Sequence, residues 1–333
     1  MATIKEVSHL ADVSAATVSR VLNGNVAVAA ETRARVLAAV ERLDYHPNTF
    51  ARGLVTNRSG GVGVVVNDIA SPFFGTMLKG IEGVAESEGM HLMISSGHAN
   101  ADAERNALDF LLRCRADVLI VHTEALSDAE MVAFASRGTP LVLVGRYVAE
   151  LASRSVYLDN EAGGCLMTEY LLAQGHTRIA HIAGPSALHD ARARLVGYRQ
   201  ALENAGLDYD AGLVVEANFE EESGRRAAQQ LLARRRDFSA LFAANDQMAA
   251  GALSALREAG IDVPNQISLV GYDDVLLARY LYPPLSTVCQ PMEAMGRAAA
   301  QLALAELRGE SGEGVRRTFE PTLVIRNSVV ARC

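Results

Sequence analysis

Small and polar side chains between residues 14 and 23 have the types and spacing of DNA-contacting groups. Two adjacent alanines let the backbone approach base edges closely, hydroxyl and amide side chains can donate to phosphate oxygens, and an arginine can reach a guanine or a phosphate. With a threonine near the start of the chain, these candidates are Thr3, Ser14, Ala15, Ala16, Thr17, Ser19, Arg20 and Asn23.

The distribution of charge along the chain supports a polyanionic partner for the same region. Residues 1–58 contain seven Lys or Arg and five Asp or Glu, a net charge of +2, whereas the whole chain of 333 residues carries −8. The rest of the chain therefore carries −10. Positive charge is concentrated where a nucleic acid would bind, although the overall balance is acidic.

A second group of polar and aromatic residues follows the ends of apolar segments farther along the chain. Ligands of parallel α/β sheets bind beyond the carboxyl ends of strands. Carboxylate, amide and guanidinium groups can bond neighbouring sugar hydroxyls, and an aromatic ring can cover the C–H side of a sugar. The candidates are Asn67, Asp68, Ser71, Phe73, Phe74, Arg146, His189, Asp190, Arg194, Phe219, Asn245 and Asp273.

Some of these residues have alternative interpretations. Phe73 and Phe74 could both belong to the core, although one of two adjacent aromatics at a helix start usually faces outward. Asp273 could cap the next segment, and His189 could be a solvated loop residue. Asp246 is expected to cap its helix rather than to contact a ligand.

The sequence contains no pattern that indicates catalysis or metal binding. A glycine-rich dinucleotide or phosphate loop after a strand, a zinc-protease HExxH and a nucleophile elbow are all missing. The cysteines, at positions 114, 165, 289 and 333, lack the spacing of metal ligands and are expected to be free thiols in a reducing compartment. We therefore expect no enzymatic activity, no cofactor and no metal.

Three helical patterns position the first group of candidates. Two short helices are separated by Asp12 and Val13, and Ser14 is a natural N-cap for the second. A third helix supplies the apolar surface that two short helices need. The three stripes are Val7, Leu10 and Ala11; Val18, Val21 and Leu22; and Val36, Leu37, Val40 and Leu43. This is the helix-turn-helix pattern, in which the second helix enters the major groove; any small helical bundle shares the spacing, but the outer face favours DNA.

Short apolar strands alternate with helical patterns from residue 62 onward, which predicts parallel α/β units. The predicted strands of the first run are 62–66, 91–95, 118–121 and 141–144, with helices at 74–87, 101–115 and 127–137. Those of the second run are 179–182, 214–215, 240–243 and 267–271, with helices at 161–174, 192–204, 223–234 and 248–259. A helix at 292–307 and a strand at 322–328 follow.

The sequence lacks signals for export or membrane insertion. No stretch is long and apolar enough to span a bilayer. The amino end is polar by Lys5 and Glu6 and has no apolar signal-peptide region. We therefore expect a cytoplasmic protein that does not contact a membrane.

Three stretches near the amino end resemble the LacI/GalR family of bacterial transcription regulators. They are ATIKEVSHLADVSAATVSRVLNGN (2–25), ETRARVLAAVERLDYHPN (31–48) and FARGL (50–54), in the order and at the spacing of that family. The resemblance continues to the end of the chain, where later blocks look most like those of galactose repressors and isorepressors.

The resemblance implies an architecture for the whole chain. It implies an all-α helix-turn-helix headpiece at 1–46, followed by a hinge helix and linker at 47–59. The effector-binding core would be two doubly wound parallel-sheet lobes, similar to periplasmic binding proteins and joined by three crossing segments. The first lobe would comprise 60–158 with 291–318, and the second 159–290 with 319–333.

The resemblance also implies a role for the hinge. Asn48 can cap a short helix over 49–56, which is too short to be stable alone. In the family this helix folds when two subunits lie side by side on the operator, and Leu54 matches the leucine that wedges into the minor groove. Asn48 and Arg52 thus join Leu54 as DNA-contact candidates, and a plain linker is the alternative. Gly53 inside the helix should make it easier to melt.

For the effector site, the family blocks match Asn245 to a residue that contacts a sugar hydroxyl. They match Arg194 to an effector anchor and Asp273 to an effector-contacting aspartate. We expect a homodimeric repressor of a near-palindromic operator whose affinity is lowered by a small, galactose-like sugar. The chain ends soon after its last strand without leucine heptads, so a dimer is expected rather than a tetramer. The alternatives are a family member using a purine corepressor or a phosphoprotein partner, and a sugar-binding protein without DNA activity.

Overall fold

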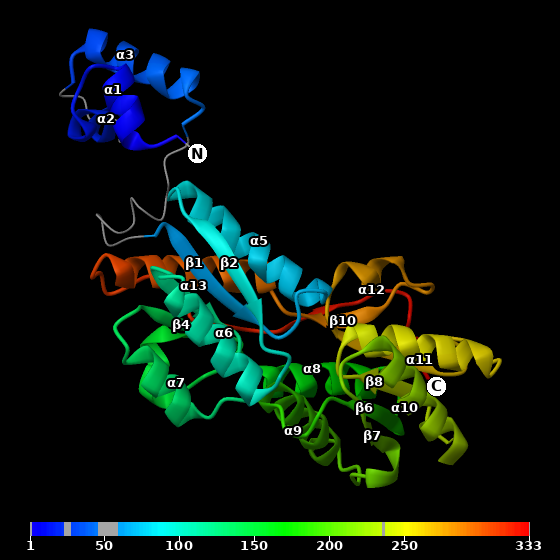
Figure 1. The fold of residues 1–333 in the computed structure, drawn as a ribbon. Coiled ribbons are helices and arrows are strands. Elements are labelled where there is room, and N and C mark those ends of the chain that lie inside the picture. The colour runs from blue at the N-terminus through cyan, green and yellow to red at the C-terminus, as the bar shows by residue number, and fades with distance from the viewer. Residues whose placement is uncertain (1, 23–27, 46–58, 235–236, 333) are drawn as a thin grey trace. The chain divides into compact units, whose positions relative to one another are not determined.

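The computed structural model describes residues 2–22, 28–45, 59–234 and 237–332. The chain divides into two compact units, Met1–Ser59 and Gly60–Cys333 (Figure 1). The predicted hinge helix, with Asn48, Arg52 and Leu54, lies outside the described residues, and so does Asn23.

The described residues of the first unit form three helices, α1 (Ile4–Leu10), α2 (Ala15–Leu22) and α3 (Ala30–Arg42). Its buried core consists of Val7, Ala11, Val18, Val21, Val36 and Ala39. The predicted stripes were wrong for Leu10 and Leu37, which are 40% and 49% exposed. The inward positions beside them are taken by Ala11 and Val36, so each leucine lies on the outer side of its helix.

In the second unit, the described residues form two six-stranded sheets. The first has the order β11-β5-β4-β3-β1-β2 and consists of β1 (Gly61–Val66), β2 (His91–Ser96), β3 (Val118–Val121), β4 (Leu141–Val144), β5 (Ser155–Leu158) and β11 (Thr318–Phe319). The second has the order β12-β10-β9-β8-β6-β7 and consists of β6 (Ile179–Ala183), β7 (Val214–Glu216), β8 (Ala240–Ala243), β9 (Ser268–Asp273), β10 (Ser286–Cys289) and β12 (Thr322–Val324). The strand pairs are parallel apart from β10 with β12.

The parallel α/β architecture predicted from the sequence is confirmed, with differences at the short strands. The prediction lacked β5, β10 and β11, because these strands have two to four residues and include polar positions such as Ser155 and Thr287. The last strand ends at Val324 rather than residue 328. Beyond it the chain makes scattered bonds rather than a regular ladder: Asn327 N donates to Pro284 O, and Ser328 O accepts from Leu269 N of β9.

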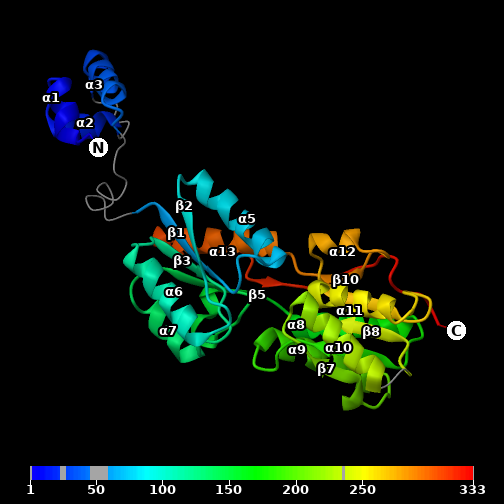
Figure 2. The same cartoon turned by 45° about the vertical axis from the view of Figure 1, so that its right-hand side comes forward.

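Helices cover both faces of each sheet (Figures 1 and 2). The first sheet packs α5 (Pro72–Ser87) and α13 (Met292–Leu307) on one face and α6 (Ala101–Arg113) and α7 (Asp128–Ala135) on the other. The second sheet packs α8 (Asn160–Ala173) and α9 (His189–Asn204) on one face and α10 (Glu221–Arg234) and α11 (Asp246–Glu258) on the other, with α12 (Leu276–Tyr280) near its edge. Short 3-10 helices lie at Ala149–Arg154 and Ala211–Leu213.

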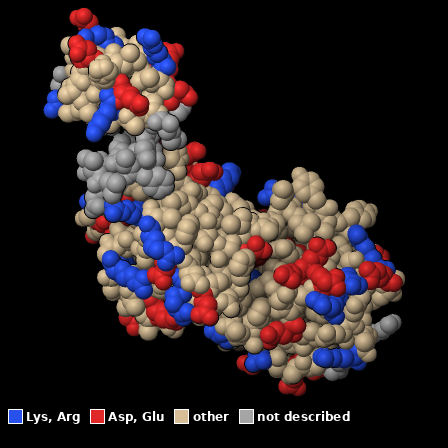
Figure 3. Space-filling view, viewed as in Figure 1, with Lys and Arg blue, Asp and Glu red and all other residues tan. Residues whose placement is uncertain are grey.

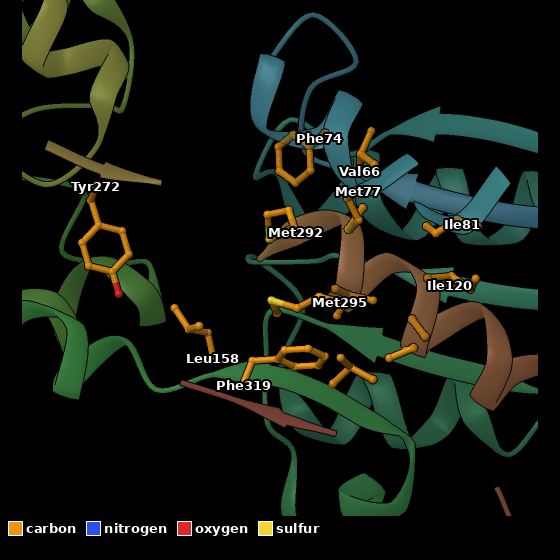
Figure 4. Packing of buried hydrophobic residues seen from close by; sticks show 14 of the residues in the cluster. Val66, Phe74, Met77, Ile81, Ile120, Leu158, Tyr272, Met292, Met295 and Phe319 are labelled. Carbon is orange, nitrogen blue, oxygen red and sulfur yellow. The ribbon is translucent and has the colours of Figure 1, made fainter. Parts of the chain in front are cut away.

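The chain passes between the two lobes three times. The first crossing joins β5 to α8 at residue 159, the second joins β10 to α13 at residues 290–291, and the third joins β11 to β12 at residues 320–321. Buried residues on both sides of these crossings belong to one apolar cluster, in which Leu158 and Phe319 lie near Met292, Met295 and Tyr272 (Figure 4). Asp159 and Glu320, at the first and third crossings, are exposed, but each is preceded by a buried residue of this cluster, Leu158 or Phe319.

Pairs of helices in the second unit approach closely through glycines. In α8 and α9, a Cβ added to Gly197 would lie 2.0 Å from Glu161 O, and one added to Gly164 would lie 2.2 Å from Arg194 O. The α5–α13 and α10–α11 pairs have equivalent glycines, at positions 80 and 296 and at positions 224 and 251. The close approach brings α9, which carries Arg194, directly against the helix that begins at the first crossing.

No helix in the described parts of the chain combines the length and apolar character needed to cross a lipid bilayer.

Candidate functional site

A cavity of about 380 Å³ lies between the two lobes of the second unit, beyond the carboxyl ends of strands from both sheets. The first lobe contributes Asn67, Asp68, Ser71, Phe73, Phe74, His98, Ala99, His122 and Glu124 to its lining. The second lobe contributes Pro185, Leu188, Asp190, Arg194, Asn218, Phe219, Glu220, Asn245, Gln247 and Asp273. A ligand in this cavity would touch both lobes at once.

The structure brings most of the predicted effector residues together in this cavity. Asp68, Phe73, Phe74, Asp190, Arg194, Phe219, Asn245 and Asp273 all line it. Arg146 does not, because its guanidinium donates to Leu126 O at 2.6 Å and forms an ion pair with Asp128. Arg146 and His189 line an adjoining cavity of about 250 Å³ instead. Ligand binding by any of these residues stays a prediction.

Arg194 projects from α9 into the cavity and is held from several sides. Its Nε donates to Asn160 Oδ1 at 2.9 Å, and its Nη1 donates to Ala244 O at 2.6 Å. The guanidinium carbon lies 3.9 Å from the centroid of the Tyr272 ring, and Nη1 lies 3.6 Å from Asp273 Oδ1. The guanidinium is therefore oriented before any ligand arrives, which reduces the entropy cost of binding.

Asp273, at the end of β9, has a φ of 106°, a left-handed value that is rare outside glycine. Its Oδ1 accepts a hydrogen bond from Gln290 Nε2 at 2.7 Å. Burial raises the pKa of Asp273 to about 6, and the Arg194 guanidinium and the Gln290 bond oppose that rise. The alternative that Asp273 caps the next segment is not supported, because Val275 is the N-cap of α12.

The interpretation of Asp246 as a helix cap was wrong. Asn245 is the N-cap of α11, with Oδ1 accepting from Met248 N at 2.8 Å, and its Nδ2 donates to Phe219 O at 3.0 Å. The buried Asp246 carboxylate instead accepts from Val275 N and Thr287 Oγ1, because β9 and β10 lie against the start of its helix. An amide can make further bonds, so Asn245 keeps the capacity to contact a ligand.

The aromatic residues divide between core and cavity. The Phe73 and Phe74 rings meet edge to face with their centroids 5.0 Å apart. Phe74 is buried and packs in the core cluster, while Phe73 is half-buried. Phe219 faces them from the second lobe with a left-handed φ of 69°, and its ring lies against Gly184, where a Cβ would be 2.3 Å from Cζ. The cavity thus has an aromatic surface in each lobe.

Several polar residues of the cavity were missed by the sequence analysis, including His98, His122, Glu124, Asn218 and Gln247. His122 and Glu124 follow the predicted strand at 118–121 directly, so the strand-end rule would have found them had it been applied to every strand. The other three also follow strands or begin a helix after one. Their positions required no information beyond the strand assignments.

Glu124 lies at the junction of the two cavities and has an unusual environment. Burial raises the pKa of its carboxyl to about 8, and Asp190 and Glu104 push it in the same direction. Glu104 is itself buried and accepts backbone hydrogen bonds from residues 124, 125 and 126 at 2.8–3.1 Å. Glu104 thereby holds the loop that carries Glu124. A protonated Glu124 can donate a hydrogen bond to a ligand oxygen at neutral pH.

His122 separates the two cavities. Its side chain is buried against the Phe74 ring, with the centroids 4.8 Å apart, and burial lowers the pKa of the imidazole. Among the described residues, its Nδ1 has no hydrogen-bond partner. Neutral imidazole can serve as donor or acceptor, so this buried nitrogen has unused hydrogen-bonding capacity.

The first unit presents the predicted DNA-contacting residues on and beside α2. Ser14, Ala16 and Arg20 are exposed, whereas Val18 and Val21 on the opposite side are buried. Ser14 caps the helix, its Oγ accepting from Thr17 N at 3.1 Å and bonding Thr17 Oγ1 at 2.9 Å, as predicted. The outer side of α2 therefore carries small and polar groups over an apolar inner side.

Thr3 has a structural role in the first unit. It is the N-cap of α1 and forms a capping box with Glu6, whose Oε2 accepts from Thr3 N at 2.6 Å. Ala15, Thr17 and Ser19 are half-buried. Basic and acidic side chains are interspersed on the face of this unit shown in Figure 3. Contacts between these residues and DNA stay predictions.

Within the described residues, no group of three or more His, Cys, Asp or Glu side chains is arranged to hold a metal ion. The three cysteines described, at positions 114, 165 and 289, are free thiols. Burial raises the pKa of the Cys165 thiol to about 11, and a hydrogen bond to Glu169 acts in the same direction. This thiol is therefore protonated at neutral pH and is a weak nucleophile.

The chain is similar to known transcription regulators over nearly its whole length. Residues 3–48 match the bacterial regulatory proteins of the lacI family, and residues 168–329 match a periplasmic binding protein-like domain. The chain is 42% identical to the HTH-type transcriptional regulator GalR of Escherichia coli (strain K12) over 329 residues, which cover 99% of this chain and 96% of the relative.

Two solved structures extend this comparison. The lac repressor dimer bound to operator and the anti-inducer ONPF aligns with a TM-score of 0.88 and 31% identity, covering 99% of each chain. A complex of the transcriptional regulator CelR with cellobiose aligns with a TM-score of 0.73 and 34% identity, covering 98% of this chain and 100% of that one.

Proposed function

The chain belongs to the LacI family of bacterial regulatory proteins, and from this premise we propose that it is a sugar-responsive repressor. It is a DNA-binding transcription regulator and not an enzyme, as its relatives are. As a homodimer in the cytoplasm it binds a near-palindromic operator. A small sugar, galactose or a galactoside, binds between the lobes and lowers its affinity for the operator.

The DNA-binding half of the proposal rests on α2 and the segment after α3. The small and polar outer side of α2 enters the major groove, and Ala15 and Ala16 set the base preference because they let the backbone approach the base edges. Leu54, in the segment after residue 46, inserts into the minor groove at the centre of the site. Two headpieces of a dimer read two half-sites, and the lac repressor was solved as a dimer bound to operator.

Exposed apolar side chains support pairing of two subunits through the second unit. Leu276, Tyr280 and Tyr282, in and just after α12, are 64%, 76% and 82% exposed. Large apolar side chains clustered on a surface mark interaction sites. The face in Figure 3 also has a broad area without Lys, Arg, Asp or Glu. We assign the exposed apolar side chains of α12 and the uncharged area in Figure 3 to contact with a second copy of the chain.

One observation carries the effector half of the proposal: a single cavity receives polar and aromatic side chains from both lobes. Arg194, Asp273 and Asn245 provide directional hydrogen-bonding groups, and Phe73 and Phe219 provide rings to cover the apolar side of a sugar. A purine would need more stacking surface than two half-buried phenylalanines offer. The galactose preference rests on the resemblance of the later blocks of the sequence to galactose repressors, and the related regulator CelR was solved in complex with cellobiose.

The proposed mechanism is thermodynamic linkage between the cavity and the operator. A ligand that touches both lobes favours one arrangement of them, and it changes operator affinity only as far as it binds the two arrangements differently. Coupling free energies of about 1–3 kcal/mol are typical and correspond to about 5- to 150-fold changes in affinity. The linkage is reciprocal, so operator DNA must weaken sugar binding by the same factor.

The experiment combines ligand screening with operator titration. Purified full-length protein is heated with D-galactose, methyl-β-galactoside, D-glucose, cellobiose, hypoxanthine or guanine, since a ligand of the native state raises the melting temperature. Each stabilising compound is then added to a fluorescence-anisotropy titration of operator DNA. We expect D-galactose or the galactoside to raise the melting temperature and to weaken operator binding at least 5-fold.

The outcomes separate the possible functions. A purine that stabilises the protein and tightens operator binding would identify a corepressor-dependent regulator instead. Stabilisation by a sugar without specific DNA binding would identify a sugar-binding protein. If none of the compounds changes the melting temperature while specific operator binding is intact, the effector is not a sugar of this class. The proposal of a galactose-like effector is then wrong, although the DNA-binding part stands.

A further inference from the structure

Four buried polar side chains form a continuous chain of contacts between the cavity and two of the interlobe crossings. Asn160 accepts a hydrogen bond from Arg194 Nε at 2.9 Å, and Arg194 Nη1 lies 3.6 Å from Asp273 Oδ1. The same Asp273 oxygen accepts from Gln290 Nε2 at 2.7 Å. Asn160 directly follows the first crossing, and Gln290 belongs to the second. We call this set, Asn160–Arg194–Asp273–Gln290, the crossing relay.

The members of the crossing relay are shielded from solvent, so each depends on its protein hydrogen-bond partners. Their exposed fractions are 4% for Asn160, 3% for Arg194, 9% for Asp273 and 6% for Gln290. A buried polar group that loses its partner cannot replace it with bulk water, and the loss costs more than the net value of the bond. The two amides are therefore constrained to follow the two charged groups.

The backbone places both amides where relative motion of the lobes must act. Asn160 is the first residue of α8, directly after the first crossing at Asp159. Gln290 follows β10, and its own backbone is tied at both ends, with Gln290 N donating to Asp273 O at 3.3 Å and Met292 N donating to Gln290 O at 2.8 Å. From there the chain enters α13, which packs on α5 in the first lobe. A rotation of one lobe on the other therefore changes the torsions beside both amides.

The charged members of the crossing relay are the ones that face the cavity. Arg194 and Asp273 line it, whereas Asn160 and Gln290 do not. Arg194 is further held by Ala244 O and by the Tyr272 ring, both in the second lobe. A ligand that bonds to Arg194 or Asp273 must therefore compete with, or reinforce, their bonds to the two crossings. Ligand contact is thus linked to the geometry of the crossings through two hydrogen bonds, Arg194–Asn160 and Gln290–Asp273.

We propose that Asn160 and Gln290 are positioning residues that transmit occupancy of the cavity to the two crossings, an inference that rests on the proposed function. They act through Arg194 and Asp273 and do not touch the ligand. Their removal should uncouple effector binding from DNA binding and leave each binding reaction in place. A merely structural role would instead lower stability without changing the ratio of operator affinities.

The test uses full-length Asn160→Ala, Gln290→Ala, the double variant and a matched control, Thr168→Val. Thr168 is fully buried on the same helix as Asn160, and its Oγ1 donates to Gly164 O at 2.8 Å, so the control removes a buried hydrogen bond outside the crossing relay. Operator affinity is measured by fluorescence anisotropy without sugar and with saturating D-galactose. Sugar affinity is measured by calorimetry.

We expect each single variant to bind operator within about 3-fold of the parent protein when sugar is absent, and to retain measurable sugar binding. The ratio of operator dissociation constants with and without D-galactose should fall at least 5-fold toward one. Thr168→Val should keep the parent ratio although its melting temperature falls. A parent-like ratio in both Asn160→Ala and Gln290→Ala would overturn the proposal.

A second measurement needs no ligand and separates this proposal from the proposed function. Melting temperatures of the parent, the two single variants and the double variant form a double-mutant cycle. Because the two amides hold opposite ends of one chain of contacts, we expect the double variant to lose less than the sum of the single losses. Additive losses would refute the crossing relay. If D-galactose fails to change operator binding by the parent protein, the proposed function fails in its choice of sugar and this cycle alone decides the relay.

Discussion

Glu124 provides a direct test of the electrostatics of the cavity. Its carboxyl lines both cavities between the lobes, with Asp190, Glu104 and Arg194 as the charged groups that influence it. Burial raises its pKa from 4.5 to about 8. Between pH 4.5 and 8, the folded protein thus keeps a proton on Glu124 that the unfolded chain has already released. Stability contributed by this group is present below pH 4.5 and is lost as the pH rises to about 8.

The size of the effect follows from the same values. One pKa unit corresponds to about 1.4 kcal/mol, so the full change is at most about 5 kcal/mol at pH 8 and above. The side chain is partly open to the cavity, and water there screens the charge, so we expect about 2–3 kcal/mol. For a domain of this size that equals about 4–10 °C in melting temperature.

The experiment compares Glu124→Gln with the parent protein from pH 5 to pH 9 by circular dichroism melts. Glutamine keeps the shape and a hydrogen-bond donor but cannot ionise, so the advantage of the variant should grow with pH and level off near pH 9. Glu220→Gln is the control, because it removes a carboxylate from the exposed rim of the same cavity. Sugar affinity gives a second readout, which should weaken above pH 8 in the parent protein and in Glu220→Gln but not in Glu124→Gln.

Parallel melting curves for Glu124→Gln and the parent protein across this pH range would refute the reasoning. They would mean that water reaches the carboxyl freely and that its charge is not penalised by burial. A growing advantage that appears equally in Glu220→Gln would also refute it, because the effect would then belong to the net charge of the cavity and not to the buried site.

Three further predictions concern the cavity, the helix packing and the hinge. Arg194→Ala should keep operator affinity within about 3-fold but abolish the response to D-galactose in anisotropy titrations; a normal response would place the effector elsewhere. Gly197→Ala should lower stability by about 1–3 kcal/mol in urea melts, because the added Cβ would lie 2.0 Å from Glu161 O; Gly75→Ala, with open space around it, should not. Leu54→Ala should lose specific operator binding while sparing the salt-dependent nonspecific binding, and equal loss of both in salt titrations would exclude the wedge.

Local patterns in the sequence were sufficient for the elements and for much of the site. Helical spacing predicted three helices in the first unit, and Ser14 caps α2 as expected from its position. Apolar runs predicted the longer strands of both sheets. The rule that ligands bind beyond strand ends then predicted Asp68, Arg194 and Asp273 as binding residues, and all three line one cavity. These features depend on residues a few positions apart, so a single sequence contains the information they need.

The choice of partner for each polar side chain was decided only by the tertiary structure. Arg146 is held by Asp128, 18 residues away, and Asp246 accepts from Thr287, 41 residues away, so neither has the role that its neighbours in sequence suggest.

The crossing relay depends on tertiary structure in the same way. Its contacts join Asn160 to Arg194 across 34 residues and Asp273 to Gln290 across 17. Such separations are bridged by crossovers and interlobe passages, whose three-dimensional course no local periodicity encodes. The sequence thus determined which residues line the cavity, and the packing of the two lobes determined which of their side chains bond to one another.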